Sequence, residues 1–237
     1  MGQSLQEILS AGWGTMLLRG AAMTLIVSFF GICLGTVIGL VGATIKTGGN
    51  WLARGLVVAY TTVVRSTPEL LVIYLLFFGT VNQAANLADW LGLDDFMHSA
   101  FPFLVGVVAI GLISGSYSVE VFRGAFKAID PGQVEAARAA GMNGWQRMRH
   151  VVLPQLVWYA LPASNNVWQA ALKDTALISL VGLVELMRAA VLGAAATRAA
   201  LTIYLLAAFI YFLIGVSSQG LFALAEHHFG RGMRRRA

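Results

Sequence analysis

Five long apolar segments, separated by short polar stretches, account for most of the 237 residues. They run over about 16–43, 55–79, 101–122, 156–184 and 200–224. A helix rises about 1.5 Å per residue, so each segment is long enough to cross a hydrocarbon layer roughly 30 Å thick. The pattern predicts an all-α integral membrane protein with five transmembrane helices, in a single domain over residues 1–237.

The polar stretches between these segments differ in charge. Residues 44–54 and 123–150 are basic, and so is the tail from Arg231 to Arg236, whereas residues 80–100 hold Asp89, Asp94 and Asp95 but no Lys or Arg. Lys and Arg concentrate on the cytoplasmic side of a membrane. The distribution predicts an N-out, C-in topology. Residues 185–199, with Glu185, Arg188 and Arg198, are then expected to return on the outer side.

Composition excludes several classes of protein. Hydrophobic residues make up 58% of the chain and charged residues only 11%, whereas soluble domains carry about 25% charged residues. The net charge of +5 lies beside the apolar segments, which suits membrane topology better than nucleic-acid binding. The single cysteine, Cys33, excludes an internal disulfide. We find no catalytic constellation, metal pattern or Gly-x4-Gly-Lys-Ser/Thr phosphate loop, so we expect no cofactor and no ATP bound by this chain.

Two apolar segments contain residues that are costly in lipid. The second includes Arg65 and Glu69 on either side of Pro68, which should kink or open the helix. The fourth includes four further polar side chains: Asn166, Gln169, Lys173 and Asp174. Such residues normally face protein or water rather than lipid, so they are candidates for a ligand pathway through the membrane.

Each candidate also has a structural interpretation. Glu69 binds a cation, or it pairs with Arg65 one helical turn earlier. Glu120, near the end of the third segment, lines the pathway, or it pairs with Arg123 or Lys127. Lys173 and Asp174 bind a ligand, or they form a local pair that neutralises itself. Asn166 and Gln169 bind a ligand, or they form hydrogen bonds that hold membrane helices together.

Glycines recur along the first segment at a helical spacing. Gly31, Gly35 and Gly39 lie four residues apart and therefore share one helix face. Small residues let two membrane helices approach closely, although glycine is also common in membrane helices in general. The spacing suggests a closely packed helix pair.

The polar stretch at about 130–154 predicts a helix, a turn and a second helix. Ala136, Ala137 and Ala140 favour a helix and form a face of small residues, and Gly141 suits the turn that ends it. Asn143 can cap the second helix, and Pro154 is tolerated in the first turn of the next one. An ordinary polar loop is the alternative.

This stretch carries a motif. Glu135-Ala136-Ala137, Gly141 and Leu153-Pro154 follow the pattern Glu-Ala-Ala-x3-Gly-x9-Ile-x-Leu-Pro, with Val151 in place of Ile. The stretch resembles the coupling loop of bacterial ABC importer permeases, which docks on an ATPase subunit. The resemblance extends over nearly the whole chain and points to the class that transports polar amino acids and opines.

The resemblance implies a type I (MetI-like) permease of the bacterial inner membrane. The partners it implies are a cytoplasmic ABC ATPase dimer that binds the ATP, a second permease subunit, identical or homologous, and a periplasmic substrate-binding protein. In that family an acidic residue at the position of Glu69 accompanies cationic amino acids or opines, so we expect such a cargo. Neutral or acidic polar amino acids are the alternative cargo, and a secondary transporter is the alternative from a different class.

Overall fold

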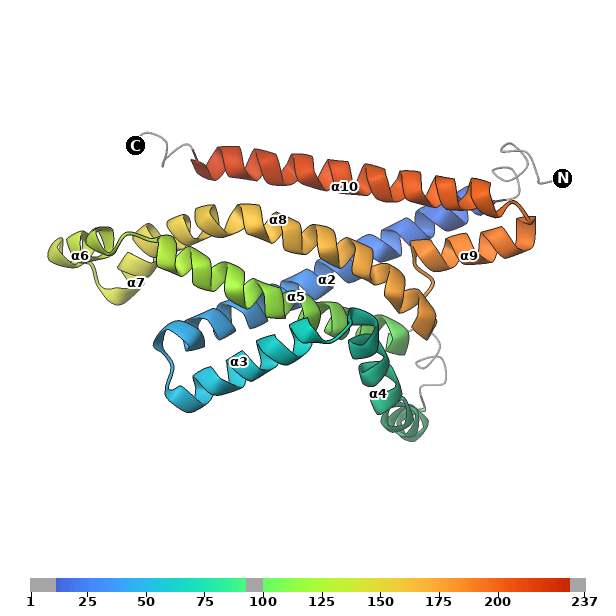
Figure 1. Cartoon of the computed structure of the whole chain (residues 1–237), viewed down its shortest axis with the longest axis horizontal. Coiled ribbons are helices and arrows are strands. Elements are labelled where there is room, and N and C mark those ends of the chain that lie inside the picture. Colours follow the sequence, from blue (N-terminus) through green and yellow to red (C-terminus); the bar gives the residue numbers. More distant parts are fainter. Residues whose placement is uncertain (1–11, 93–99, 231–237) are drawn as a thin grey trace.

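The computed structural model describes residues 12–92 and 100–230, and the regular elements in these ranges are helices (Figure 1). In chain order they are α2 (Trp13–Gly48), α3 (Trp51–Ser66), α4 (Glu69–Leu91), α5 (Phe101–Ala128), α6 (Pro131–Ala139), α7 (Gly144–Arg147), the π-helical turn η2 (Met148–Val152), α8 (Leu153–Ile178), the 3-10 turn η3 (Ser179–Val181), α9 (Leu186–Thr197) and α10 (Ala200–Gly230). The all-α expectation is confirmed. The expected N-terminal and C-terminal ends, Asp94 and Asp95 lie outside the described residues.

Four helices of the described chain are long and apolar enough to cross a membrane: α2, α4, α5 and α10. A fifth span is reached when the stretch Gly144–Val181 and helix α9 count as one broken span, bent by 54°. Counted in this way, the described chain has up to five candidate spans, and the last expected segment corresponds to α10.

The second expected segment, 55–79, is wrong as a single helix. The chain breaks at Thr67, whose extended backbone has φ −96° and ψ 136°, and α4 then continues to Leu91. Pro68 lacks an N–H and disfavours helical backbone in the residue before it, so the break is the stronger form of the expected kink.

Helices α2 and α5 run parallel and pack through small residues. A Cβ added to Gly31 would lie 2.5 Å from Cγ2 of Ile110, and one added to Gly42 would lie 2.5 Å from Cγ2 of Val119. A Cβ on Gly35 would collide with Ser114 between these two points. The close helix pair suggested by the glycine spacing is confirmed, and α5 is its partner.

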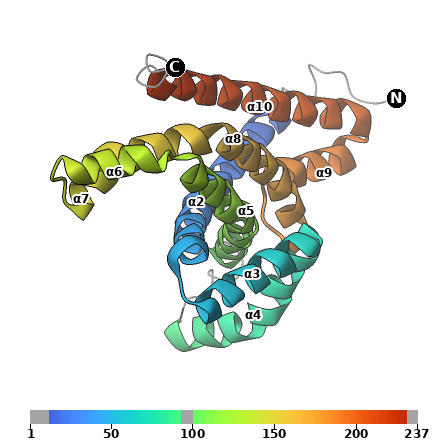
Figure 2. The same ribbon diagram turned by 60° about the vertical axis from the view of Figure 1, so that its left-hand side comes forward.

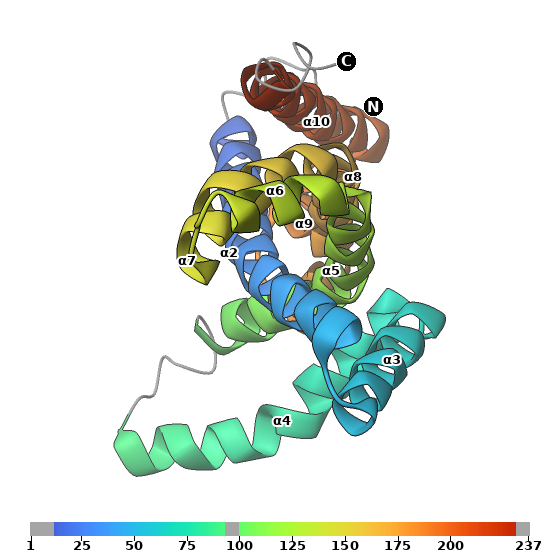
Figure 3. The same cartoon turned by 90° about the vertical axis from the view of Figure 1, so that its left-hand side faces the viewer.

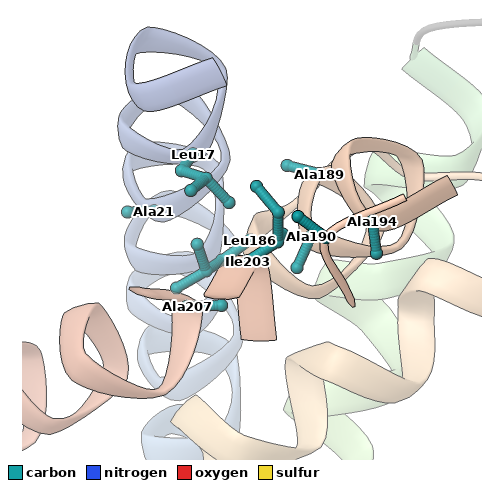
Figure 4. Packing of buried hydrophobic residues seen from close by; sticks show 9 residues of the cluster. Leu17, Ala21, Leu186, Ala189, Ala190, Ala194, Ile203 and Ala207 are labelled. Atoms are coloured by element: carbon teal, nitrogen blue, oxygen red, sulfur yellow. The ribbon is translucent and has the colours of Figure 1, made fainter. Parts of the chain in front are cut away.

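Helix α9 packs beside the N-terminal part of α2 and the start of α10. Leu17 and Ala21 of α2 meet Leu186, Ala189 and Ala190 of α9 and Ile203 of α10 in one buried cluster (Figure 4). The fourth expected segment, 156–184, was therefore placed wrongly at its end. Helix α8 stops at Ile178, and after the turn η3 the chain forms α9, which packs against α2 and α10.

Glu185 holds this turn in place. Its side chain is 0% exposed and accepts hydrogen bonds from the backbone N–H groups of Met187 (2.9 Å) and Arg188 (2.8 Å). It also accepts from Thr24 Oγ1 of α2 (3.2 Å) and Tyr211 Oη of α10 (3.0 Å). The carboxylate at this helix N-terminus therefore satisfies four donors from three helices.

Three parts of the molecule extend away from this bundle. Helices α3 and α4 lie on one side of it and α10 on the other (Figures 2 and 3). Helices α6 and α7 project beyond the ends of α5 and α8 (Figure 1).

Candidate functional site

The projection formed by α6 and α7 has the expected helix–turn–helix structure. Asp130 caps α6 by accepting from the N–H of Gly132 (2.8 Å), and Gly141 ends it in the left-handed conformation, with φ +80°. Asn143 and Gln146 cap α7 reciprocally, each side chain accepting from the other's N–H. Pro154 lies in the first turn of α8, directly after the π-helical turn η2.

Most motif residues on this projection face outward. Glu135, Ala136, Gly141, Leu153 and Pro154 are exposed, and Ala140 is exposed as well. Ala137 is 6% exposed, so the expected face of three small residues is divided between the outside and the chain itself.

The base of the projection is attached to both neighbouring helices. Val134 of α6 and Val152 of η2 pack on a buried cluster made by Ala125 and Ile129, at the end of α5, and by Leu156 of α8. The Gln155 side-chain amide donates to Oε1 of Gln133 across the same junction (2.8 Å). A force on α6 is therefore transmitted to the ends of both α5 and α8.

A cavity of about 220 Å³ lies between α5 and α8. It brings together Asn166 and Asp174 of α8 with Tyr117 and Ser114 of α5, among apolar neighbours. Glu69, in the first turn of α4, is close enough to Asp174 for the two negative charges to repel each other. Asn166 and Asp174 thus line one cavity, and Glu69 interacts with Asp174 from α4 without lining that cavity.

A second cavity, of about 440 Å³, lies among α2, α3 and α5. Its polar lining includes Lys46, Arg65, Ser66, Tyr117 and Glu120. The Arg65 guanidinium lies 5.2 Å from the centre of the Tyr117 ring, in a cation–π contact. Arg65 and Glu69 form no ion pair in the described chain, because the break at Thr67 removes the helical turn that would align them.

Glu120 is held by two cations. Lys46 Nζ lies 2.6 Å from one carboxylate oxygen, and Arg123 Nη2 lies 2.6 Å from the other. The structural interpretation was right about Arg123, but Lys46 occupies the place expected for Lys127. The sequence contained a signal for this, because Lys46 follows Gly39 and Gly42 at helical spacing and so shares the face that meets α5.

A third cavity, of about 640 Å³, lies between α8 and α10. Gln169 and Lys173 line it together with Tyr211 and Gln219. Gln169 Nε2 donates to the carbonyl oxygen of Gly215 (3.2 Å), so this side chain joins the two helices. Lys173 and Asp174 do not pair with each other in the described residues, since consecutive helical positions face different directions.

The sequence candidates therefore occupy three places around α5 and α8 rather than one. Within residues 12–92 and 100–230, no group of three His, Cys, Asp or Glu side chains suits a metal ion. Glu185 was missed because a carboxylate between two apolar segments has the sequence signature of an ordinary loop.

Comparison with known proteins gives a consistent result. The family described as "Binding-protein-dependent transport system inner membrane component" matches residues 31–231. The octopine transport system permease protein OccQ of Rhizobium radiobacter is 45% identical over 224 residues, which cover 94% of each chain. The histidine/lysine/arginine/ornithine transport system permease protein HisQ of Salmonella typhimurium is 34% identical, over 94% of this chain and 97% of the relative.

A solved structure supports the same assignment. "Crystal structure of an amino acid ABC transporter with histidines" contains a chain with a TM-score of 0.78 and 28% identity, covering 96% of this chain and 100% of that one. The expected resemblance to ABC importer permeases, and with it the inner-membrane location, is confirmed. The protein belongs to the family of binding-protein-dependent transport system inner membrane components.

Proposed function

We propose that this chain is the permease subunit of an ATP-driven importer for cationic amino acids or opines. The relatives OccQ and HisQ carry the names of such cargoes, octopine in one case and histidine, lysine, arginine and ornithine in the other. The observation that carries the proposal for this chain is a cavity in the helix bundle lined by Asn166 and Asp174, with Glu69 in the first turn of the neighbouring helix α4.

Two carboxylates of like charge repel each other strongly in surroundings with little water. An ammonium or guanidinium group placed between them relieves that repulsion and gains two charge-assisted contacts. Asn166 lines the same cavity and offers a side-chain amide to hydrogen-bonding groups of the cargo. The cationic end of the cargo therefore binds between Glu69 and Asp174. Arg65, Glu120, Gln169 and Lys173 line the neighbouring cavities that the cargo passes or that a partner completes.

The projection of α6 and α7 couples this site to ATP hydrolysis. Glu135, Ala136 and Gly141 form an outward surface for a cytoplasmic ATPase subunit, and Leu153-Pro154 begins the helix that carries Asp174. When the ATPase pair closes, movement of α6 is passed to α5 and α8 through the cluster around Leu156. A rigid rocking of these helices then switches access to the cargo site.

The complete assembly holds two permease subunits, two ATPase subunits and a periplasmic binding protein. A single chain with five spans encloses only part of a pathway, and the outer faces of α4 and α10 are rich in exposed apolar residues. A second permease subunit, identical or homologous, completes the pathway, and the binding protein delivers the cargo.

Uptake measurements on Glu69 variants test the cargo site. Glu69→Leu and Glu69→Gln should each lower uptake of a cationic amino acid by a factor of about 30 or more, since loss of one partner of a desolvated charge pair costs about 2 kcal/mol or more. Asp89→Asn is the matched control, because Asp89 is exposed near the other end of the same helix. Unchanged uptake in both Glu69 variants would show that Glu69 is structural only.

A further inference from the structure

Tyr117 lies between two cavities of opposite charge. On one side it lines the cavity that contains Asp174, and on the other it lines the cavity that contains Lys46 and Arg65. The second cavity is nearer the end of α5 from which α6 and α7 project, because Glu120 follows Tyr117 by three residues. A molecule moving from one cavity to the other passes this ring.

The positive charge in the second cavity is not neutralised within the described chain. Glu120 is the one acidic residue in its lining, and its two oxygens already bind Lys46 and Arg123 at 2.6 Å each. Arg65 takes part in neither of these two ion pairs. Its guanidinium has an excess charge that an anion entering the cavity would balance.

The contact of Arg65 with Tyr117 leaves it able to bind such an anion. A cation–π contact uses the charge of the guanidinium, and the N–H donors that do not point at the ring remain available to an anion. Two of these donors match the two oxygens of a carboxylate. The hydroxyl groups of Thr62 and Ser66 line the same cavity and add further donors.

We propose that the cavity lined by Lys46 and Arg65 is a carboxylate site for the cargo. It rests on the proposed function, in which the cationic end of the cargo binds between Glu69 and Asp174. The cargo is thereby recognised at two charges of opposite sign, with Tyr117 between them. The cavity volume of about 440 Å³ falls in the range of roughly 300–1,000 Å³ that is usual for small-molecule sites.

Three ligands separate the two charges. Arginine, octopine and agmatine all carry a guanidinium, but they have one, two and no carboxylate groups respectively. Their binding is measured on the complete permease–ATPase assembly in lipid nanodiscs, without the binding protein, so that the permease alone discriminates. The wild-type assembly should bind arginine and octopine at least about ten-fold more tightly than agmatine, as a charge-assisted bidentate contact implies.

Arg65→Gln should remove this preference, because it should weaken the binding of arginine and octopine about ten-fold and leave the binding of agmatine unchanged. Arg54→Gln is the matched control, because Arg54 is exposed on the same helix α3 and does not line the cavity. It should keep the wild-type preference.

Several outcomes would overturn the carboxylate site. Equal binding of the three ligands to the wild-type assembly, or equal weakening of all three by Arg65→Gln, would do so. Binding of inorganic sulfate that depends on Arg65 while arginine binding does not would make the cavity a site for inorganic anions. Asp174→Asn keeps these failures distinct from failure of the proposed function, because loss of the cation site should weaken agmatine as well as arginine.

Discussion

Helices α5 and α4 are both apolar enough to cross a membrane, but they differ in how much of their surface is buried by the rest of the chain. Of the most apolar stretch of α5, 67% is buried within the chain, against 6% of that of α4. The difference lies in the neighbouring surfaces. Helix α5 faces the glycines of α2, whereas α4 presents large side chains such as Leu71, Leu75 and Phe78 outward.

Apolar character alone indicates that a helix lies in the membrane, but small residues indicate where it meets another helix of the same chain. Lipid does not drive apolar helices together, so close backbone contact and interhelical hydrogen bonds supply the association. The α2–α5 pair therefore forms a rigid centre, while lipid or another subunit covers the exposed apolar side chains of α4 and α10. The candidate cargo site lies where the rigid centre meets α8 and the start of α4.

Gly35→Leu should have the largest effect on the folded subunit. A side chain at Gly35 collides with Ser114 and with the backbone of α5, and overpacking of a closed interface typically costs about 1–3 kcal/mol and occasionally more. We expect loss of the folded subunit from detergent extracts, measured by size-exclusion chromatography. Gly79→Leu in α4 is the control, since nothing lies within 4 Å of its added Cβ. Similar yields for the two variants would contradict the distinction between α5 and α4.

Glu185→Leu should lower the stability of the assembly while the α2–α5 pair still forms. It leaves the hydroxyls of Thr24 and Tyr211 and two backbone N–H groups without their acceptor, and each unsatisfied buried group costs about 1–3 kcal/mol. The melting temperature of the purified assembly should fall clearly. Glu185→Gln keeps one acceptor oxygen, so its melting temperature should lie between those of the wild type and Glu185→Leu. A melting temperature unchanged by Glu185→Leu would show that α9 does not depend on this carboxylate.

Gly141→Asp should change the structure least and the transport cycle strongly. Nothing lies within 4 Å of an added Cβ, and Asp tolerates the left-handed conformation better than most residues. We expect the subunit to remain in the membrane with little loss of stability, whereas uptake is lost because the variant places a charge on the surface proposed to meet the ATPase. Gly55→Asp in α3 is the control, at an equally open position. Normal uptake by Gly141→Asp would refute the coupling role of the projection.

Local features of the sequence predicted the parts of the structure that depend on neighbouring residues. The turn at Gly141, the cap at Asn143 and the break at Pro68 each follow from the backbone chemistry of one or two residues, as does the place of Pro154 in the first turn of α8. The glycine spacing of α2 also predicted a close helix contact, because it defines one helix face.

Features that depend on contacts between distant segments could not be predicted from the local sequence. Glu185 is buried because α2 and α10 bring Thr24 and Tyr211 to it, over sequence separations of 161 and 26 residues. Lys46 and Glu120 meet for the same reason, over 74 residues. The polar positions of α8 could be identified as candidates, but the direction in which Lys173 and Asp174 point depends on which helices flank α8.

The ATPase activity of the purified assembly, measured with its binding protein and a panel of amino acids and opines, tests the central claim most directly. The account predicts stimulation by arginine, lysine, histidine or a guanidino opine, and uptake that stops when ATP hydrolysis is blocked while ion gradients are held constant. Stimulation by neutral or acidic amino acids alone would contradict the cation site at Glu69 and Asp174. Uptake that continues without ATP hydrolysis would contradict the importer mechanism itself.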